Sequence, residues 1–302
     1  MSAPVGVVGA GSFGRALATA IQREGEAILW SRSARDEVYI TTNEEDLARC
    51  ELIFIAVPSM HVPEVAKVLA PVLDGRHLLV HVSRGLIGDE LQTVSRHLRA
   101  STPARRVGCL AGPLDPRVFT GGEPGGGIVG TPFPEVADAV RDAIAGGGLR
   151  LYDTDDVVGV EVASAMVGLL AMQAGFCLES KIRPSAMAVM MSRGLDEAAR
   201  VGVQLGGREQ TFHGMAGTGD LFAALSGDER AEVRLGRALA QSFDLDEAGK
   251  QAGAYIEGLT IARRVANFAE SRGIEAPIAA ITAKALEGSM TIEEGLRHLM
   301  QR

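Results

Sequence analysis

Three glycines near the start of the chain have the spacing of a turn that binds phosphate groups. An apolar run from Val5 ends in Gly9, Gly11 and Gly14, and helical apolar spacing follows over 15–23. Each glycine has its own reason: a tight turn, close approach of the backbone to a pyrophosphate, and close packing of helix on strand. The helix N-terminus would then hold the phosphates, because its N–H groups and dipole favour an anion. The pattern predicts a dinucleotide-binding turn.

The next apolar stretch, 27–30, is a second strand, and the residue at its tip selects the cofactor. An acidic residue here binds the ribose hydroxyls of NAD, but this chain has Ser31 and Arg32. Arg32 can take a 2′-phosphate or stack on adenine, or it is an ordinary surface arginine. The sequence therefore predicts NAD or NADP as the cofactor.

Composition bounds the class of protein. With 302 residues the chain is long enough for two domains, and its net charge of -8 argues against binding nucleic acid. Three scattered cysteines without flanking histidines indicate buried thiols rather than disulfides or a metal site. No signal peptide precedes the first strand and no apolar run is an uninterrupted membrane span, so we expect a cytoplasmic protein.

The first half alternates strands and helices. Apolar runs over 51–57 and 77–82 read as parallel strands, and Pro58 follows the first of them, beside the expected cofactor. Arg84 follows the second, where a cation can hold a substrate phosphate or carbonyl oxygen; the alternative is a surface arginine in a turn. Further strands over 107–110, 127–129 and 150–152 predict an α/β domain over 1–154 with a doubly wound, mostly parallel, Rossmann-type sheet.

The second half has helical patterns only. We expect an all-helical C-terminal domain over 155–302, which would bind the substrate. Its expected helices span 157–175, 186–202, 230–242, 260–272, 278–286 and 291–300. Asp220 lies in the small-residue turn T-F-H-G-M-A-G-T-G-D-L, as a ligand-binding group or as a helix N-cap. His213 of that turn reads as a packing residue rather than a general base.

Together these residues resemble the bacterial NAD(P)-dependent glycerol-3-phosphate dehydrogenase family over nearly the whole chain. The matching stretches are G-A-G-S-F-G-R-A-L-A (9–18), W-S-R (30–32), V-P-S (57–59), A-G-P (111–113), G-V-E (159–161), S-R-G-L (192–195), the turn at 211–221 and Y-I-E-G (255–258).

The resemblance implies a fold, a reaction and a set of site residues. Such enzymes interconvert dihydroxyacetone phosphate and glycerol 3-phosphate by hydride transfer with NAD(P)H, so the implied substrate is a small anion. The implied cofactor-binding residues are Gly9, Gly11, Ser12, Phe13, Gly14, Arg32, Pro58, Arg84 and Glu257. The implied substrate-binding residues are Arg84, Gly112 and Asp220. The resemblance leaves a homodimer open.

The chain departs from the family where the chemistry takes place. Read without a gap from Glu161, the family's catalytic lysine and asparagine fall on Val167 and Gly168, and a valine cannot exchange a proton. The family's Ser-Arg-Asn phosphate clamp falls on 230–232, here Arg-Ala-Glu, which replaces donors by a carboxylate. Among the remaining polar groups, Asp220, Arg84 and Lys181 are the catalytic candidates, and Lys181 is alternatively a solvated loop charge.

Three functions follow from these observations. The first is the family reaction, with Lys181 or Arg84 replacing the lost lysine. The second is a dehydrogenase of the same fold that acts on another hydroxy compound. The third is a non-catalytic protein that binds NAD(P).

Overall fold

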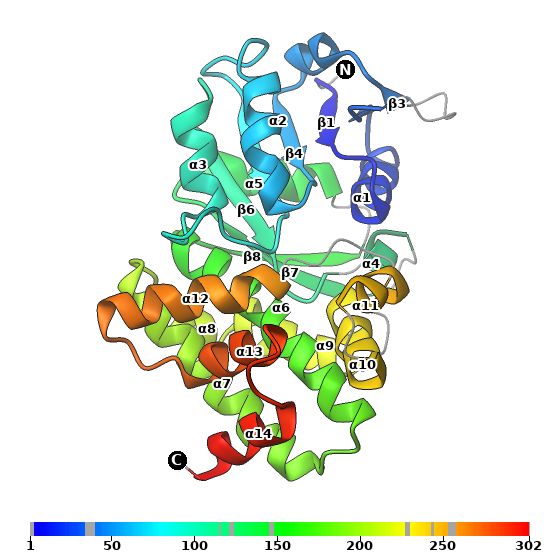
Figure 1. Ribbon diagram of the computed structural model, residues 1–302. Coiled ribbons are helices and arrows are strands. Elements are labelled where there is room, and N and C mark those ends of the chain that lie inside the picture. The colour runs from blue at the N-terminus through cyan, green and yellow to red at the C-terminus, as the bar shows by residue number, and fades with distance from the viewer. Residues whose placement is uncertain are drawn as a thin grey trace. The chain divides into compact units, whose positions relative to one another are not determined.

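The computed structural model describes residues 3–33, 40–114, 116–120, 124–144, 148–226, 230–242, 245–252 and 258–301. The packing of the chain forms two compact units (Figure 1). The first, here called the sheet unit, comprises residues 1–84 and 93–161. The second, the helical unit, comprises residues 85–92 and 162–302.

One sheet organises the sheet unit (Figure 1). Its strands are β1 (Val5–Val8), β2 (Ala27–Trp30), β3 (Ile40–Thr41), β4 (Leu52–Ile55), β5 (Leu78–His81), β6 (Arg106–Ala111), β7 (Gly125–Gly130) and β8 (Leu149–Thr154). The spatial order is β3-β2-β1-β4-β5-β6-β7-β8, and every neighbouring pair is parallel except β6 and β7.

Strand order reverses at β1, which pairs with β2 on one side and β4 on the other. In open parallel sheets, ligands bind at the carboxyl ends of the strands that flank such a switch point. The strands that surround it read as continuous apolar runs because both sheet faces are covered. In β4, for example, all four residues are buried.

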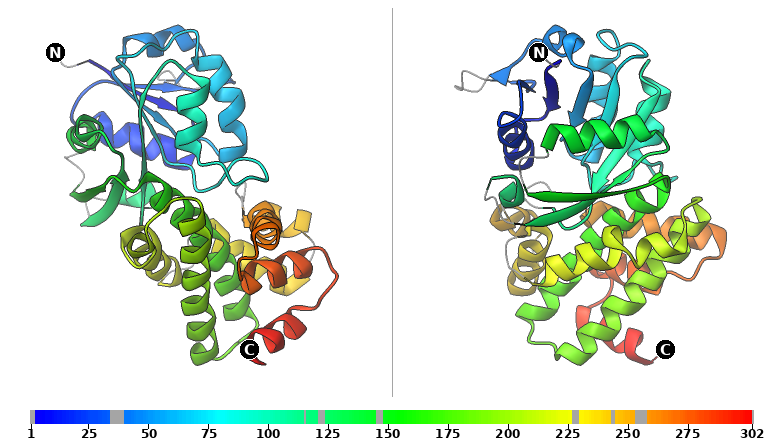
Figure 2. Two further views of the ribbon diagram at one scale, coloured as in Figure 1. Left: turned by 90° about the vertical axis from the view of Figure 1, so that its left-hand side faces the viewer. Right: turned by 180° about the vertical axis from the view of Figure 1, so that it is seen from behind.

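Helices cover the sheet on both faces. They are α1 (Ser12–Ile21), α2 (Val62–Leu69), α3 (Val94–Ser101), α4 (Pro116–Thr120) and α5 (Pro134–Ile144), with 3₁₀ turns η1 (Glu44–Arg49) and η2 (Ser59–His61). Residues of α1, α4 and α5 share one apolar cluster with alternate residues of the strands, such as Leu52 and Phe54 of β4. Helices α2 and α3 lie side by side (Figure 2), and α3 contacts β5 and β6.

The helical unit is built mainly from α6 (Val157–Glu179), whose first turn still belongs to the sheet unit, and α7 (Pro184–Gln204). The further elements are α8 (Glu209–Phe212), the π turn η4 (Met215–Gly219), α9 (Asp220–Leu225), α10 (Ala231–Ser242), α11 (Leu245–Ala252), α12 (Gly258–Arg272), α13 (Pro277–Leu286) and α14 (Ile292–Gln301).

Helix α6 is long and apolar enough to cross a membrane by length and composition, yet 83% of its most apolar window is buried inside the protein. Core helices of globular proteins have the same character, because they are apolar on every side. It is the one such helix found among the described residues.

A short segment of the first half packs with the helical unit. In residues 85–92, the Leu86 carbonyl accepts a hydrogen bond from Arg264 of α12 at 3.2 Å, and the Glu90 carboxylate pairs with Arg272 at 2.8 Å. Sequence patterns did not predict this exchange, because it depends on contacts between residues far apart in the chain.

The predicted fold class is confirmed: a doubly wound sheet with helices on both faces is followed by a helical region. A capping box precedes the last helix, α14. The Thr291 N–H donates to the Glu294 carboxylate at 2.9 Å, and the Glu294 N–H donates to the Thr291 hydroxyl at 3.2 Å. The domain boundary after residue 154 stays a prediction.

Candidate functional site

Two close backbone approaches shape the turn after β1. Gly9 has φ +113°, and a Cβ on it would lie 2.4 Å from the carbonyl oxygen of Ala56. A Cβ on Gly14 would lie 1.9 Å from the carbonyl oxygen of Gly9. Both positions therefore require glycine. Gly11 differs, because no atom lies within 4 Å of the place its Cβ would take.

Hydrogen bonds hold the three strand ends at this turn in register. The Gly9 N–H donates to the carbonyl of Trp30 at 2.9 Å, and the Ala56 N–H donates to the carbonyl of Val8 at 2.7 Å. The ends of β1, β2 and β4 thus form one rigid edge at the switch point of the sheet.

The first turn of α1 can receive an anion. Gly11 is its N-cap and supplies no side-chain acceptor, so the leading N–H groups of the helix are left for a ligand or water. Gly11 and Ser12 are exposed, whereas the ring of Phe13 packs edge-on against Phe119, with centroids 5.2 Å apart. Phe13 can therefore contribute its backbone, while its ring belongs to the core. This arrangement fits a pyrophosphate.

Arg32, at the tip of β2, forms an ion pair with Glu64 of α2 at 2.7 Å. Both side chains are more than half exposed. Such a surface pair contributes little free energy, so a ligand phosphate can displace the carboxylate.

The ends of β4, β5 and β6 bring three predicted residues into one region. Pro58 begins the turn after β4, and the Ser83 hydroxyl donates to the carbonyl of Val57 at 2.7 Å. The guanidinium of Arg84 donates to the carbonyls of Gly112 at 3.2 Å and of Leu114 at 3.0 Å. Arg84 therefore braces the loop after β6, in addition to any role toward a ligand.

In the helical unit, three charged side chains form a cluster, which we call the acidic clamp: Asp220, Arg230 and Glu232. Arg230 pairs with Asp220 at 3.0 Å and with Glu232 at 3.2 Å, and Asp220 is 1% exposed. Burial opposes the charge of Arg230, but the charges and hydrogen bonds of both carboxylates outweigh it and raise the pKa of Arg230. These three side chains together carry one excess negative charge.

The acidic clamp lies close to α6 at Gly168. A Cβ on Gly168 would lie 3.6 Å from a carboxylate oxygen of Glu232. The neighbouring residue, Val167, is fully buried in an apolar cluster that includes Leu170 and Leu221. A carboxylate and an apolar cluster thus occupy the surroundings of these two α6 positions.

Comparison with known proteins decides the family. The models of the N-terminal and C-terminal parts of NAD-dependent glycerol-3-phosphate dehydrogenase match residues 34–114 and 156–297. A glycerol-3-phosphate dehydrogenase [NAD(P)+] of Xanthomonas campestris pv. campestris is 31% identical, over 99% of this chain and 94% of its own length. One of Thiobacillus denitrificans is also 31% identical, over 98% and 97%.

The chain belongs to the NAD-dependent glycerol-3-phosphate dehydrogenase family. The crystal structure of the glycerol-3-phosphate dehydrogenase of Coxiella burnetii has the same fold, with a TM-score of 0.91 at 24% identity over 100% of this chain and 99% of that one. The family resemblance predicted from the sequence is thereby confirmed, and so is an NAD(P)-binding N-terminal domain.

The structure also places two further residues from the sequence analysis, Lys181 and His213. Lys181 is exposed in the turn after α6, and roughly 18 Å of helix separates Val167 from the last residue of α6. It is too far along α6 to replace a lysine at position 167. His213, expected to be a packing residue, is exposed. Glu257 lies outside the described residues.

Sequence reasoning missed a buried polar contact at the start of α6. His81 of β5 lies 2.7 Å from the carboxylate of Glu161, both side chains are 1% exposed, and the Ser95 N–H donates to the same carboxylate at 2.9 Å. A signal was present: Glu161 is the one charge in the apolar run of α6 over 157–175, and a buried charge needs a partner. The pair anchors the first turn of α6 to the sheet.

Proposed function

We propose that this chain is an NAD(P)-dependent oxidoreductase that transfers a hydride between the cofactor and a small hydroxy or keto compound, as its glycerol-3-phosphate dehydrogenase relatives do. The observation that carries the proposal is the turn after β1. Close contacts there require glycine at Gly9 and Gly14, while Gly11 is left open beside the uncapped N-terminus of α1.

In this proposal, residues 1–154 bind the cofactor and residues 155–302 bind the substrate. Gly9, Gly11 and Gly14 let the backbone approach the pyrophosphate, and the N–H groups of Ser12 and Phe13 add to the positive end of α1. The nicotinamide, when bound, carries the hydride. The remaining proposed cofactor residues are Arg32, Pro58, Arg84 and Glu257. The proposed substrate residues are Arg84, Gly112 and Asp220.

We further propose that the chain is a divergent member without the family's catalytic lysine. The support comes from the surroundings of Val167 and Gly168. Val167 is fully buried among apolar side chains, and a side chain at position 168 would meet the Glu232 carboxylate. With Lys181 beyond the far end of α6, the polar candidates for proton transfer that remain are Asp220 and Arg84. A guanidinium holds its proton near neutral pH, which favours Asp220.

A second candidate function is the oxidation or reduction of a hydroxy compound that carries no phosphate. The acidic clamp favours it. A phosphate monoester carries close to two negative charges at neutral pH, and like charges repel one another. The family resemblance puts a phosphate clamp at 230–232. In this chain, Arg230 is instead paired with two carboxylates, those of Glu232 and Asp220.

The test is oxidation of NADH and NADPH by the purified protein with dihydroxyacetone phosphate and, in parallel, with dihydroxyacetone. Cofactor binding is measured separately by fluorescence. Turnover of the phosphate ester supports the family reaction, and turnover of dihydroxyacetone alone supports the second candidate. Cofactor binding without turnover of either compound leaves a non-catalytic NAD(P)-binding protein, and absence of binding overturns the proposal.

Matched variants assign the residues. Asp220→Asn should lower kcat/KM, because a buried amide cannot exchange a proton, whereas Lys181→Ala should leave it unchanged. The double variant Ala231→Arg with Glu232→Asn should raise the activity on dihydroxyacetone phosphate relative to dihydroxyacetone. If the double variant leaves this ratio unchanged, the acidic clamp does not determine the substrate. A homodimer and a cytoplasmic location stay predictions.

A further inference from the structure

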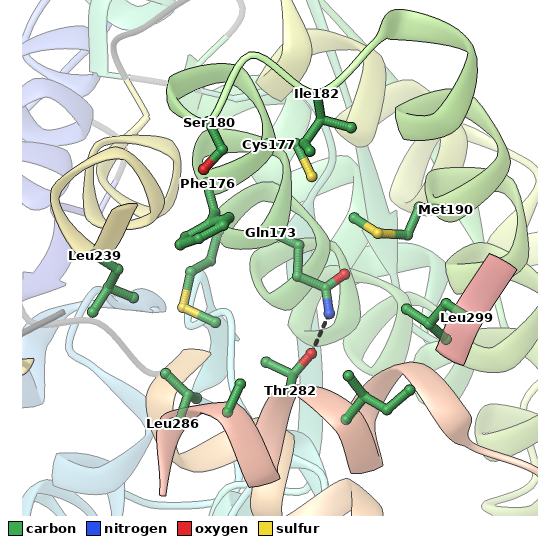
Figure 3. A pocket seen from close by; sticks show the side chains of 13 residues that line it. Gln173, Phe176, Cys177, Ser180, Ile182, Met190, Leu239, Thr282, Leu286 and Leu299 are labelled. Carbon is green, nitrogen blue, oxygen red and sulfur yellow. Dashed lines mark hydrogen bonds between the residues drawn. The ribbon is translucent and has the colours of Figure 1, made fainter. Parts of the chain in front are cut away.

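The helical unit contains a cavity whose walls come from α6, α7, α10, α13 and α14 (Figure 3). Its volume is about 230 Å³, and none of the described residues that line it has a charged side chain. The larger apolar side chains in the wall are Phe176, Met190, Leu239, Ile281, Leu286 and Leu299. Among the described lining residues, none belongs to the proposed cofactor or substrate sites.

One amide interrupts this apolar wall. The hydroxyl of Thr282 donates its only proton to the carbonyl of Ile278 at 2.8 Å. Thr282 must therefore accept its second hydrogen bond, and the donor is the amide nitrogen of Gln173. This assignment leaves the amide oxygen of Gln173 buried, and it has no hydrogen-bond partner among the described residues. In Figure 3 that oxygen points away from Thr282, toward Met190.

Two further polar side chains in the wall, Cys177 and Ser180, add no charge to the cavity. Burial raises the pKa of Cys177 to about 11, so its thiol stays protonated near neutral pH and acts as a small apolar group. Ser180 is exposed at the end of α6. An anion would find no cation in this wall, and a buried amide oxygen would repel it.

We propose that this cavity binds a small, neutral, apolar molecule with one hydroxyl group, which donates a hydrogen bond to the amide oxygen of Gln173. The apolar part of the ligand fills the space between α6, α13 and α14, and its hydroxyl donates to the buried amide oxygen of Gln173. A cavity of about 150 Å³ holds benzene, so this one suits a ligand of roughly nine non-hydrogen atoms.

The test compares three probes of matched size by isothermal titration to the whole chain: 1-octanol, 1-methoxyheptane and heptanoate. The ether keeps the chain length but cannot donate a hydrogen bond, and heptanoate carries a charge. We expect saturable binding of one octanol per chain, with about tenfold weaker binding of the ether and no measurable binding of heptanoate. Equal affinity for octanol and the ether, or preference for heptanoate, overturns the proposal.

Two variants place the binding site. Gln173→Leu should abolish the preference for octanol over the ether, because both probes then meet an apolar wall. Ala285→Leu, which adds volume to the wall, should weaken both probes by about tenfold or more. If either variant unfolds, the ratio of the two affinities in the unchanged protein still decides.

A second copy of this chain is the competing occupant of the cavity. Sedimentation of the protein with and without octanol distinguishes the two. If the protein is a dimer that octanol neither enters nor dissociates, the cavity belongs to a subunit interface and the proposal fails.

Discussion

The substitution Gly11→Ala tests whether the β1–α1 turn binds the cofactor without disturbing how the turn folds. Gly11 has φ -75° and ψ 179°, which is extended backbone that alanine adopts, and no atom lies within 4 Å of the new Cβ. The fold should therefore lose at most about 1 kcal/mol, from a less favourable N-cap residue. At Gly14 the same change puts a Cβ 1.9 Å from a carbonyl oxygen, so Gly14→Ala should disrupt the turn itself.

Gly11→Ala should nevertheless weaken cofactor binding, because the added methyl group meets the ligand and not the protein. If the pyrophosphate lies against Gly11, the added methyl group occupies space that the phosphate oxygens need. Overpacking of this kind costs about 1–3 kcal/mol, which raises the dissociation constant about 5- to 150-fold. NADH and NADPH should lose affinity alike, because the pyrophosphate is common to both.

Fluorescence titration with each cofactor and thermal unfolding of the free protein test this reasoning. Gly75→Ala is the matched control: Gly75 is exposed in the sheet unit, has no atom within 4 Å of its Cβ position and lies in another loop, between α2 and β5. It should change neither stability nor affinity. If Gly11→Ala binds both cofactors within twofold of the unchanged protein, the pyrophosphate does not lie on this turn and the cofactor site is wrong.

Four further predictions concern stability and specificity. Burial raises the pKa of Glu197 to about 7 from an ordinary value of 4.5, so the folded state keeps a proton that the unfolded state has lost. The free energy of unfolding should therefore fall by on the order of 3 kcal/mol as pH rises from about 4.5 to 7, and Glu197→Gln should flatten that fall in urea titrations at several pH values. His81→Phe should lower the free energy of urea unfolding by about 1–3 kcal/mol, because the buried carboxyl group of Glu161 loses its polar neighbour, and an unchanged value would show that this contact does not stabilise the fold. Arg32→Ala should weaken NADPH about tenfold with NADH unchanged in fluorescence titrations, and equal changes for both would exclude 2′-phosphate binding. Val167→Lys should unfold at lower urea without gaining turnover, because the ammonium enters an apolar cluster.

The sequence predicted those parts of the fold that local rules determine. The turn was found because its three glycines have a recognisable spacing, and Gly9 and Gly14 each answer a local backbone requirement. The apolar run of α6 was found because its length and composition exceed those of a strand. By contrast, β3 is a strand of two residues within a polar stretch, and it exists through its pairing with β2. No local pattern marks such an element.

The candidate site shows the same division. Asp220 and Glu232 were singled out one at a time, from a turn and from a departure in a motif. Their joint pairing with Arg230 requires the fold, because ten residues of chain separate Asp220 from the arginine. His81 looked like an ordinary strand residue, and its partner Glu161 lies 80 residues further along the sequence. Charge pairs over such distances leave no periodic signal in a single sequence.

We propose that the region around Val167 and the acidic clamp departs from the family as a unit. A lysine at position 167 would need polar surroundings, yet Val167 packs against Leu170 and Leu221 with no exposed surface. A phosphate would need donors near α10, yet the carboxylate of Glu232 faces position 168 of α6 and shares Arg230 with Asp220. Restoring one group leaves the others in place, so no single substitution should recreate the chemistry of the relatives. The turn after β1, in contrast, keeps each close contact that forces glycine. Cofactor binding and substrate choice therefore have to be measured separately, because the residues that support the first say nothing about the second.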